Sequence, residues 1–363
     1  MTDTSVRLPD SAWRTRFRRR LMAWFRRNAR NLPWRRTRDP YAVWVSEIML
    51  QQTQVVTVVG YYERFLAAFP TLADLAAAGE QQVLRLWEGL GYYRRARQLH
   101  AAAKIIVAEH GGEFPRHPEQ IRSLPGIGRY TAGAIASIAW DAREPILEAN
   151  TVRVFSRLLG YRGDPARNHG QQLLWEFSAS LLPARDVGLF NQALMELGSE
   201  ICAPRGPRCA QCPVGSLCPT KREGLQAVIP QPKRKTIYED RREAAVIVRR
   251  GDRVVLRRCA PHERWAGLWD FPRFPVTAQR GDPLRRQLAQ AAAQLTGLAV
   301  APGPRLTTIK HGVTRFRITL DCYEAECTGG RLKRGGEVRW VKIGELESFP
   351  LSVTGRKISG LLR

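Results

Sequence analysis

Four cysteines lie close together in this chain, in a pattern typical of metal centres. They are spaced C-x6-C-x2-C-x5-C, at Cys202, Cys209, Cys212 and Cys218. Four thiolates in one short loop can surround a single 4Fe–4S cluster or one Zn²⁺ ion. Zinc knuckles usually show two C-x2-C pairs and this chain has one, which favours the iron–sulfur alternative. The total of seven cysteines is odd, so we expect a reducing compartment and no disulfide framework.

A turn with two glycines has the residue types needed to bind phosphate. Gly126 and Gly128 lie two residues apart and precede an expected helix over Arg129–Ala139. Glycines permit positive φ angles and expose successive backbone N–H groups, and a helix N-terminus adds partial positive charge. Most G-x-G turns only change the direction of the chain, so this motif is not specific by itself.

The charge of the whole chain also favours an anionic partner. Its 363 residues carry 58 Lys and Arg against 33 Asp and Glu, a formal net charge of +25. Such a surplus fits nucleic acid or an anionic membrane surface. No run of about 18 apolar residues predicts a transmembrane helix, and we expect no secretory signal. Aromatic and leucine side chains recur at helical spacing between Ser11 and Arg30, which predicts an amphipathic first helix.

The length of the chain indicates two or three domains that position these groups. Residues 1–219 are expected to form a mostly helical domain, with the cysteine loop, residues 202–218, near its end. Residues 220–239 are basic and contain prolines, which predicts an exposed linker. Residues 240–363 are expected to form a separate α+β domain, because their apolar residues follow a strand period. Its expected elements are strands over Ala244–Arg249, Arg253–Arg257, Arg305–Lys310, Arg315–Glu324 and Glu337–Lys342, and a helix over Pro283–Leu298.

Several longer strings resemble one group of DNA-repair enzymes. The string Leu124–Ala132, which contains the two glycines, resembles the helix-hairpin-helix of the endonuclease III superfamily of base-excision glycosylases. Further strings resemble the MutY adenine glycosylases, namely Leu32–Arg35, Trp44–Val55, Gly89–Tyr93 and Gln192–Gly198. The resemblance covers almost the whole chain and implies a mainly α helix-hairpin-helix glycosylase core with an iron–sulfur loop. It further implies one 4Fe–4S cluster on the four cysteines, and DNA contacts at Gly126, Gly128 and Thr131.

Tyr130 lies at a hairpin position that distinguishes two branches of this superfamily. In the lyase branch a lysine fills the position, and its amine attacks the sugar to form a Schiff base. A tyrosine cannot do this. The resemblance therefore implies a monofunctional glycosylase, which leaves an abasic site.

Two carboxyl groups can divide the work of cleaving an N-glycosidic bond. One protonates the leaving base and the other stabilises the oxocarbenium-like sugar, as in glycoside hydrolysis. Glu47 lies in a largely apolar helical segment, where burial would raise its pKa and keep a proton available. A glutamate in a helix is more often solvated, but the resemblance makes Glu47 the acid that protonates adenine N7.

Glu148 is the second carboxylate, and here the chain departs from the family pattern. The family usually has Asp-Gly-Asn, and this chain has Glu148-Ala149-Asn150. The longer side chain keeps the charge that stabilises the sugar, whereas attack from a fixed distance is more sensitive to its length. Alternatively, Glu148 stabilises the dipole of a helix N-terminus. Asn150 and Tyr130 are expected to orient these groups and the attacking water.

The resemblance also assigns residues that handle the extruded base, which needs a shaped pocket. Gln52 and Tyr92 are expected to probe or wedge the opened base stack. The adenine pocket is expected to be lined by Arg30, Trp34, Arg35 and Glu196. Core packing is the alternative role for Trp34 and Tyr92, and surface charge for Arg30.

The C-terminal domain resembles a Nudix domain, most clearly at Trp265–Pro272. A working Nudix hydrolase holds Mg²⁺ with glutamates on its helix, and Ala291–Leu298 contains no acidic residue. We therefore expect a recognition domain without hydrolase activity. In MutY proteins this domain reads 8-oxoguanine with a Phe-Ser-His tip, which here corresponds to Val313-Thr314-Arg315. Thr314 keeps the hydroxyl group for the lesion, while the aromatic wedge and the imidazole are lost.

These observations predict a monofunctional adenine DNA glycosylase that acts on double-stranded DNA with adenine opposite 8-oxoguanine or guanine. We expect it to be a monomer in the cytoplasm, associated with the nucleoid. One alternative is a G·T mismatch thymine glycosylase, against which the Nudix-like domain and the string Gln51-Gln52-Thr53 argue. Another is a non-catalytic protein that binds damaged DNA, if Glu148 cannot support the chemistry. A membrane-surface protein would explain none of the motifs.

Overall fold

The computed structural model of the protein describes residues 7–231, 237–335 and 337–362. The chain forms two compact units, of which the first comprises Met1–Ala77 and Gln98–Arg234. The second comprises Ala78–Arg97 and Lys235–Arg363. Residues 232–236, in the expected basic linker, lie outside the described residues. Within the described ranges, no helix has the length and apolar character needed to cross a membrane.

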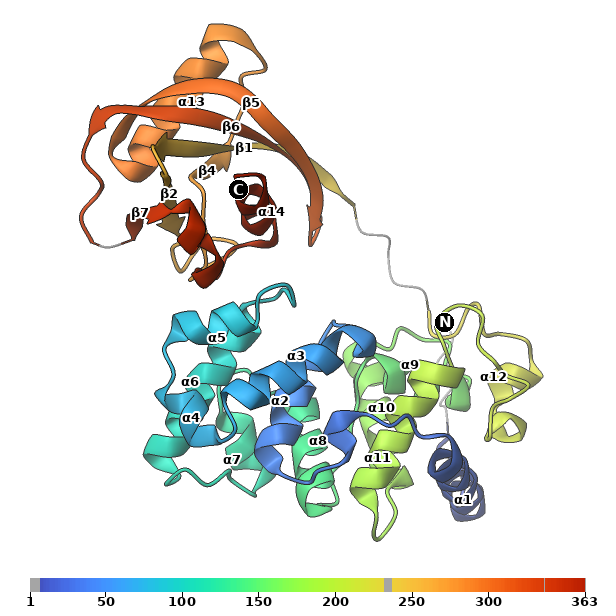
Figure 1. The fold of residues 1–363 in the computed structure, drawn as a ribbon. Helices are drawn as coiled ribbons and strands as arrows, with labels where there is room; N and C mark the ends of the chain where they lie inside the picture. Colours follow the sequence, from blue (N-terminus) through green and yellow to red (C-terminus); the bar gives the residue numbers. More distant parts are fainter. Residues whose placement is uncertain (1–6, 232–236, 336, 363) are drawn as a thin grey trace. The chain divides into compact units, whose positions relative to one another are not determined.

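The first unit is helical, as the sequence predicts (Figure 1). Its main helices are α1 (Ser11–Asn28), α2 (Pro40–Leu50), α3 (Val55–Ala68), α4 (Leu72–Ala77), α6 (Arg94–Glu109, from Gln98 on), α7 (Pro118–Ser123), α8 (Arg129–Trp140), α9 (Ala149–Leu159), α10 (Asn168–Leu181), α11 (Val187–Glu196) and α12 (Pro219–Arg222). Three short helical turns join them: η1 (Pro33–Arg35), η2 (Leu197–Ile201) and η3 (Gly215–Leu217). The expected amphipathic first helix is α1, which buries Phe17, Leu21 and Phe25.

Local sequence explains where the helices that carry the pocket begin. Asp39 caps α2, because its carboxylate accepts hydrogen bonds from the N–H groups of Tyr41 and Ala42. Pro40 occupies the first helical position, where the missing N–H costs nothing. Every residue of α2 from Tyr41 to Met49 is buried, so this helix runs through the interior of the unit.

The second unit contains a seven-stranded mixed sheet, together with α5 (Glu80–Leu86). The strands are β1 (Glu239–Arg250), β2 (Arg253–Arg258), β3 (Trp269–Asp270), β4 (Arg273–Pro275), β5 (Leu298–Val313), β6 (Phe316–Gly330) and β7 (Val338–Lys342). The main path runs β3-β2-β1-β6-β5, while β4 pairs with β1 and β7 with β2. Strands β1 and β6 are parallel, and the other pairs are antiparallel.

Two helices cover opposite faces of this sheet (Figure 1). Helix α13 (Gly281–Thr296) packs Leu284, Leu288 and Ala292 against one face. Helix α14 (Val353–Leu361) and the short turn η4 (Ile343–Ser348) cover the other face, where Ile358 and Leu346 are buried. Only one acidic residue, Asp282, lies in α13, at its exposed first turn. The helix therefore lacks the carboxylates that a Mg²⁺ site on it would need.

The strands and the helix predicted for this part of the chain are present. The sequence did not predict β3, β4 or α14. Two- and three-residue strands are too short to show an alternating pattern, which explains the first two. Strand β5 begins earlier than expected. Register shifts near Ala299 and Pro302 interrupt the alternation of its first residues, so the sequence pattern did not reveal them.

Candidate active site

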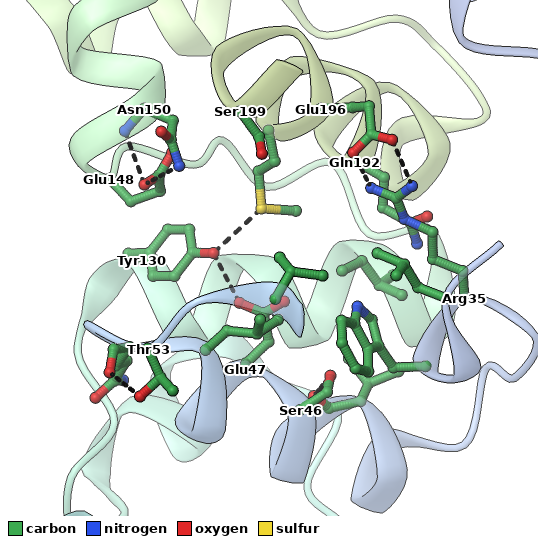
Figure 2. A pocket seen from close by; sticks show the side chains of 18 of the residues that line it. Arg35, Ser46, Glu47, Thr53, Tyr130, Glu148, Asn150, Gln192, Glu196 and Ser199 are labelled. Carbon is green, nitrogen blue, oxygen red and sulfur yellow. Dashed lines mark hydrogen bonds and ion pairs between the residues drawn. The ribbon is translucent and has the colours of Figure 1, made fainter. Parts of the chain in front are cut away.

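A cavity of about 460 Å³ opens in the first unit among α2, α8, α11 and the N-terminus of α9. Most of the residues that the sequence assigned to catalysis and base handling line it: Arg30, Trp34, Arg35, Glu47, Gln52, Tyr130, Glu148, Asn150 and Glu196. Figure 2 shows Glu47, Tyr130 and Glu148, from three different elements, facing the same space. The fold thus brings together residues that are far apart in the sequence.

Glu47 is buried on the pocket side of α2, with 5% of its surface exposed. The Tyr130 hydroxyl lies 2.7 Å from its Oε2 atom (Figure 2). Burial raises the pKa of Glu47 to about 7, because the charged form loses hydration. The Tyr130 hydrogen bond and the Arg35 charge oppose this shift, while Glu148 adds to it. Glu47 can therefore hold a proton near neutral pH, as the sequence predicted for an acid.

Glu148 is both a helix cap and part of the pocket wall. Its Oε2 accepts hydrogen bonds from the backbone N–H and the side-chain amide of Asn150, at 2.8 and 3.2 Å. Its Oε1 accepts one from the N–H of Thr151 at 2.9 Å. Burial raises the pKa of Glu148, and these hydrogen bonds oppose the rise. The same side chain thus caps α9 and lines the pocket, so its position is compatible with both roles considered from the sequence.

Asn150 is held in place by Arg153. The guanidinium donates to Asn150 Oδ1 at 2.9 Å and to the carbonyl of Gly198 at 2.8 Å. It also donates to the carbonyl of Cys202 at 2.6 Å. These contacts tie the cap of α9 to the start of the cysteine loop, and they fix the amide that bonds Glu148.

The opposite side of the pocket contains an ion-pair network around a buried glutamate, Glu196. Glu196 accepts hydrogen bonds from Arg30, the shortest at 2.6 Å, and from Arg35 at 2.9 Å. Burial alone would raise the pKa of Glu196, but the hydrogen bonds from Arg30 and Arg35 outweigh it and lower the pKa to about 2. Glu196 is therefore ionised at neutral pH, and Arg30 is paired with it rather than being a simple surface charge.

The sequence gave no role to several residues that also line the pocket, namely Ser46, Gln192, Met195 and Ser199. Met195 is the most informative of these, because its sulfur lies 3.2 Å from the Tyr130 hydroxyl (Figure 2). A helical period places Gln192, Met195 and Ser199 on one face of α11 and η2. This helical spacing is the sequence signal that could have placed all three residues on the face of Glu196's helix that lines the pocket. In the string Gln192–Gly198, a role was expected only for Glu196.

Gln52 and Tyr92, expected to probe the opened base stack, share an uncommon backbone conformation. Both have left-handed φ angles, 56° for Gln52 and 47° for Tyr92. Both are exposed, Tyr92 with 53% of its surface. Non-glycine residues in this region are strained and cluster at functional sites. The exposure of Tyr92, which belongs to the second unit, argues against the core-packing alternative for this residue.

At the glycine-containing turn, one of the two glycines has the positive φ angle considered from the sequence, and Gly128 is extended. Gly126 has a φ of +81°, and an added Cβ would lie 2.8 Å from Gln98 Cβ. Gly128 caps α8, and nothing lies within 4 Å of where its Cβ would be. Thr131 is 3% exposed, and its hydroxyl oxygen lies 3.4 Å from the Gln51 amide. A phosphate would therefore meet backbone N–H groups at this turn rather than the Thr131 side chain.

The four clustered cysteines line one cavity near α9. Among the residues that the structure describes, no three His, Cys, Asp or Glu side chains are arranged to hold one metal ion. A Zn²⁺ site needs all sulfurs about 2.3 Å from one point, whereas an iron–sulfur cluster needs a space between them. Arg157 donates to the Cys202 sulfur at 3.3 Å, and Gln226 lies 3.6 Å from the Cys209 sulfur. Four thiol groups around one cavity are a donor set that suits a 4Fe–4S cluster.

The expected lesion-reading tip is the two-residue turn between β5 and β6 in the second unit. Thr314 has a left-handed φ of 52°, a strained conformation for a β-branched residue. Its hydroxyl donates to the carbonyl of Val313 at 2.7 Å. The Arg315 guanidinium lies 5.2 Å from the centre of the Phe316 ring. The aromatic ring missing at Val313 is thus present three residues later, beside an arginine.

Comparison with protein families finds two matches along the chain. Residues 45–180 match the model of the HhH-GPD superfamily of base excision DNA repair proteins. Residues 243–359 match the NUDIX domain model. Glu47, Tyr130 and Glu148 lie inside the first match, and the β5–β6 tip lies inside the second.

Individual proteins match the chain with clear sequence identity. The chain is 47% identical over 218 residues to the adenine DNA glycosylase of Rattus norvegicus, covering 58% of this chain and 42% of that protein. It is 36% identical over 259 residues to the adenine DNA glycosylase of Buchnera aphidicola subsp. Schizaphis graminum, covering 71% of this chain and 75% of the relative. This chain therefore spans less than half of the rat protein but most of the bacterial one.

Among solved structures, a thermostable thymine-DNA glycosylase matches with a TM-score of 0.54 and 31% identity. The match covers 98% of that chain and 58% of this one. Almost nothing remains in that relative to correspond to the NUDIX part of this chain.

The fold and the pocket define a helix-hairpin-helix DNA-repair protein with a C-terminal Nudix-like domain. Within this class, the match over three quarters of a bacterial relative shows that the chain belongs to the adenine DNA glycosylase family.

Proposed function

We propose that this protein is a monofunctional adenine DNA glycosylase, which removes adenine paired with 8-oxoguanine or guanine in double-stranded DNA. The observation that supports the proposal best is the Glu47 carboxyl group. It is buried in a cavity large enough for an extruded base, its pKa is raised to about 7, and a second carboxyl group lines the same cavity. Family membership favours adenine as the base.

The pocket residues suggest how the reaction proceeds. Glu47 donates its proton to N7 of the flipped adenine, and the bond between the base and C1′ breaks with its electron pair leaving on the base. The Glu148 anion stabilises the positive sugar. Water then adds its oxygen to C1′, and its released proton restores the acid form of Glu47. Tyr130 offers no amine for a Schiff base, so the DNA strand stays intact.

Other groups of the chain support binding rather than bond cleavage. The Glu196–Arg30–Arg35 network forms a rigid, charged wall that donors and acceptors of a purine edge can contact. The backbone N–H groups at Gly126 and Gly128 are available for a phosphate. Cys202, Cys209, Cys212 and Cys218 would hold one 4Fe–4S cluster, which stabilises the loop that connects to Arg153. Thr314 is the candidate contact to 8-oxoguanine.

A gel assay tests the activity with four duplexes: A opposite 8-oxoguanine, A opposite guanine, T opposite guanine, and thymine glycol. We expect base loss only from the first two, with the strand broken only after alkali. The thymine-glycosylase alternative predicts release from the third duplex instead, and the lyase alternative predicts strand breaks without alkali. Binding to the first two duplexes without base loss would favour the non-catalytic damage-binding protein.

Three further properties complete the proposal. We propose that the protein acts as a monomer, because the pocket is formed entirely by the first unit of one chain. We propose a cytoplasmic, nucleoid-associated location, which the reducing environment required by an iron–sulfur cluster favours. Gel filtration at several concentrations tests the first property, and fractionation with bound DNA tests the second. A dimer at all concentrations, or a location away from DNA, would contradict them.

A further inference from the structure

The Tyr130 hydroxyl group has one hydrogen and two acceptors. Its oxygen lies 2.7 Å from Glu47 Oε2 and 3.2 Å from the Met195 sulfur (Figure 2). A phenol donates one hydrogen bond, and a thioether sulfur is a weak acceptor. The two distances therefore describe alternative directions of one O–H group.

The charge of Glu47 decides between these directions. An ionised carboxylate accepts a strong, charge-assisted hydrogen bond, so Tyr130 then donates to Glu47. A protonated Glu47 accepts only weakly, and the sulfur of Met195 can then compete for the hydroxyl hydrogen. The Tyr130 oxygen lone pairs then face the carboxyl group. An acceptor on the far side of Tyr130 thus stabilises the acid form of Glu47 relative to the carboxylate.

We propose that Met195 is a positioning residue, whose thioether accepts the Tyr130 hydroxyl and thereby helps Glu47 to stay protonated. This inference rests on the proposed function, because it concerns the acid of that reaction. It adds a residue that acts through Tyr130 and does not itself touch the reacting atoms.

The other groups facing Glu47 come from different elements and do not depend on Met195. Glu148, at the start of α9, favours the protonated form, and Arg35, the last residue of η1, favours the carboxylate. Both side chains are held by hydrogen bonds of their own, Glu148 by Asn150 and Thr151, and Arg35 by Glu196. Replacing the Met195 side chain by one of similar volume would leave these charges in place.

The simple alternative is that Met195 only packs against the extruded base. It is half-buried and lines the cavity, as a packing residue would. Packing alone would change the rate of base release by the same factor at every pH. A role through Tyr130 moves the pH at which activity is lost, and requires the Tyr130 hydroxyl.

The test measures single-turnover release of adenine opposite 8-oxoguanine, with saturating protein, from pH 5 to 9. We expect Met195→Leu to lose activity at a lower pH than wild type, by about half a pH unit, the size of one modest hydrogen bond. Above that transition the variant should be about threefold slower, and below it nearly equal. Met195→Gln, whose amide oxygen is an acceptor, should restore the transition toward that of wild type.

The Tyr130→Phe background makes the test specific. Without the hydroxyl, adding Met195→Leu should leave the transition where Tyr130→Phe alone puts it. Ile138→Val, a change elsewhere in the lining of the cavity, serves as the packing control and should not move the transition. An unmoved transition in Met195→Leu overturns the proposal, and so does a shift that persists in Tyr130→Phe.

A measurement on the protein without DNA separates this proposal from the proposed function. The Glu47 carboxyl group can be titrated by ¹³C NMR with labelled glutamate, its signal identified by its loss in Glu47→Gln. If wild type releases no adenine, the proposed function fails, but a lower Glu47 pKa in Met195→Leu would still support the contact. An equal Glu47 pKa in the two proteins would reject it.

Discussion

Two glutamates on opposite sides of one pocket have opposite acid strengths. Glu47 and Glu196 are both buried, with 5% and none of their surface exposed. Glu47 has one hydrogen-bonding neighbour, a neutral phenol, and its pKa rises to about 7. Glu196 has two guanidinium groups, and its pKa falls to about 2. Burial is common to both, so the charged partners decide which carboxyl group is an acid and which is a fixed anion.

The largest expected effect is on the acid side of the pocket. Glu47→Gln keeps the shape and removes the proton donor, so we expect base release to fall by about 10²–10⁴-fold while DNA binding persists. Single-turnover release and a binding titration on the same duplex measure the two properties. Retained turnover would show that Glu47 is not the acid that protonates the base. The different acid strengths of Glu47 and Glu196 would then have no part in catalysis.

The second expected effect concerns Glu148. Burial raises its pKa, as for Glu47, while hydrogen bonds oppose that rise, as for Glu196. Glu148→Ala should lower base release by about 10²–10³-fold, because the anion near the sugar is lost. It should also reduce stability by about 1 kcal/mol through loss of the helix cap. Glu148→Asp should preserve or improve activity, and is the matched control. If Ala performs as well as wild type, the stabilising anion lies elsewhere.

The third prediction is the pH dependence of stability on the acid side. The folded pKa of Glu47 is raised, so the folded protein holds this proton where the unfolded chain has released it. Its favourable contribution is complete below about pH 4.5 and is lost as the pH rises through 7. Above pH 7 we therefore expect Glu47→Gln to be more stable than wild type, by about 3 kcal/mol.

Urea unfolding at pH 4.5, 6 and 8 measures this difference. The gain should grow with pH and disappear at the lowest value. An equal stability difference at all three pH values would show that Glu47 does not titrate abnormally in the folded protein.

The smallest expected effect lies on the anion side. Glu196→Gln leaves Arg30 and Arg35 without their counter-charge and should cost about 2 kcal/mol of stability at pH 7. This is below the roughly 3–5 kcal/mol of a fully buried pair, because the Arg30 side chain is 32% exposed. The folded pKa of Glu196 is lowered, so its contribution is present above about pH 4.5 and is lost as the pH falls toward 2.

Unfolding of Glu196→Gln beside Glu47→Gln therefore sharpens the comparison. The two variants should change stability in opposite directions at pH 8, although both replace a buried glutamate by glutamine. A loss in both would mean that burial, rather than the charged neighbours, controls these groups.

Much of the site could be predicted from sequence because its signals are local. The two glycines, the tyrosine after them and the cysteine spacing are each contained within a few residues. The apolar surroundings of Glu47 in α2 predicted its burial, and the structure agrees. The missing acidic residues of α13 were equally visible. The two-residue strand β3 was too short to show a comparable signal. Helix α14 was missed although Ser352, a residue type that favours helix starts, caps it.

The amino-acid sequence by itself determined which chemical groups the protein has and which helices and strands carry them. Only the tertiary structure decided their acid strengths. Tyr130 reaches Glu47 across 83 residues of sequence, and Arg30 reaches Glu196 across 166. The physical reason is that a helical period reports neighbours three or four residues apart, whereas a pKa depends on every charge and donor that the fold brings within a few ångströms.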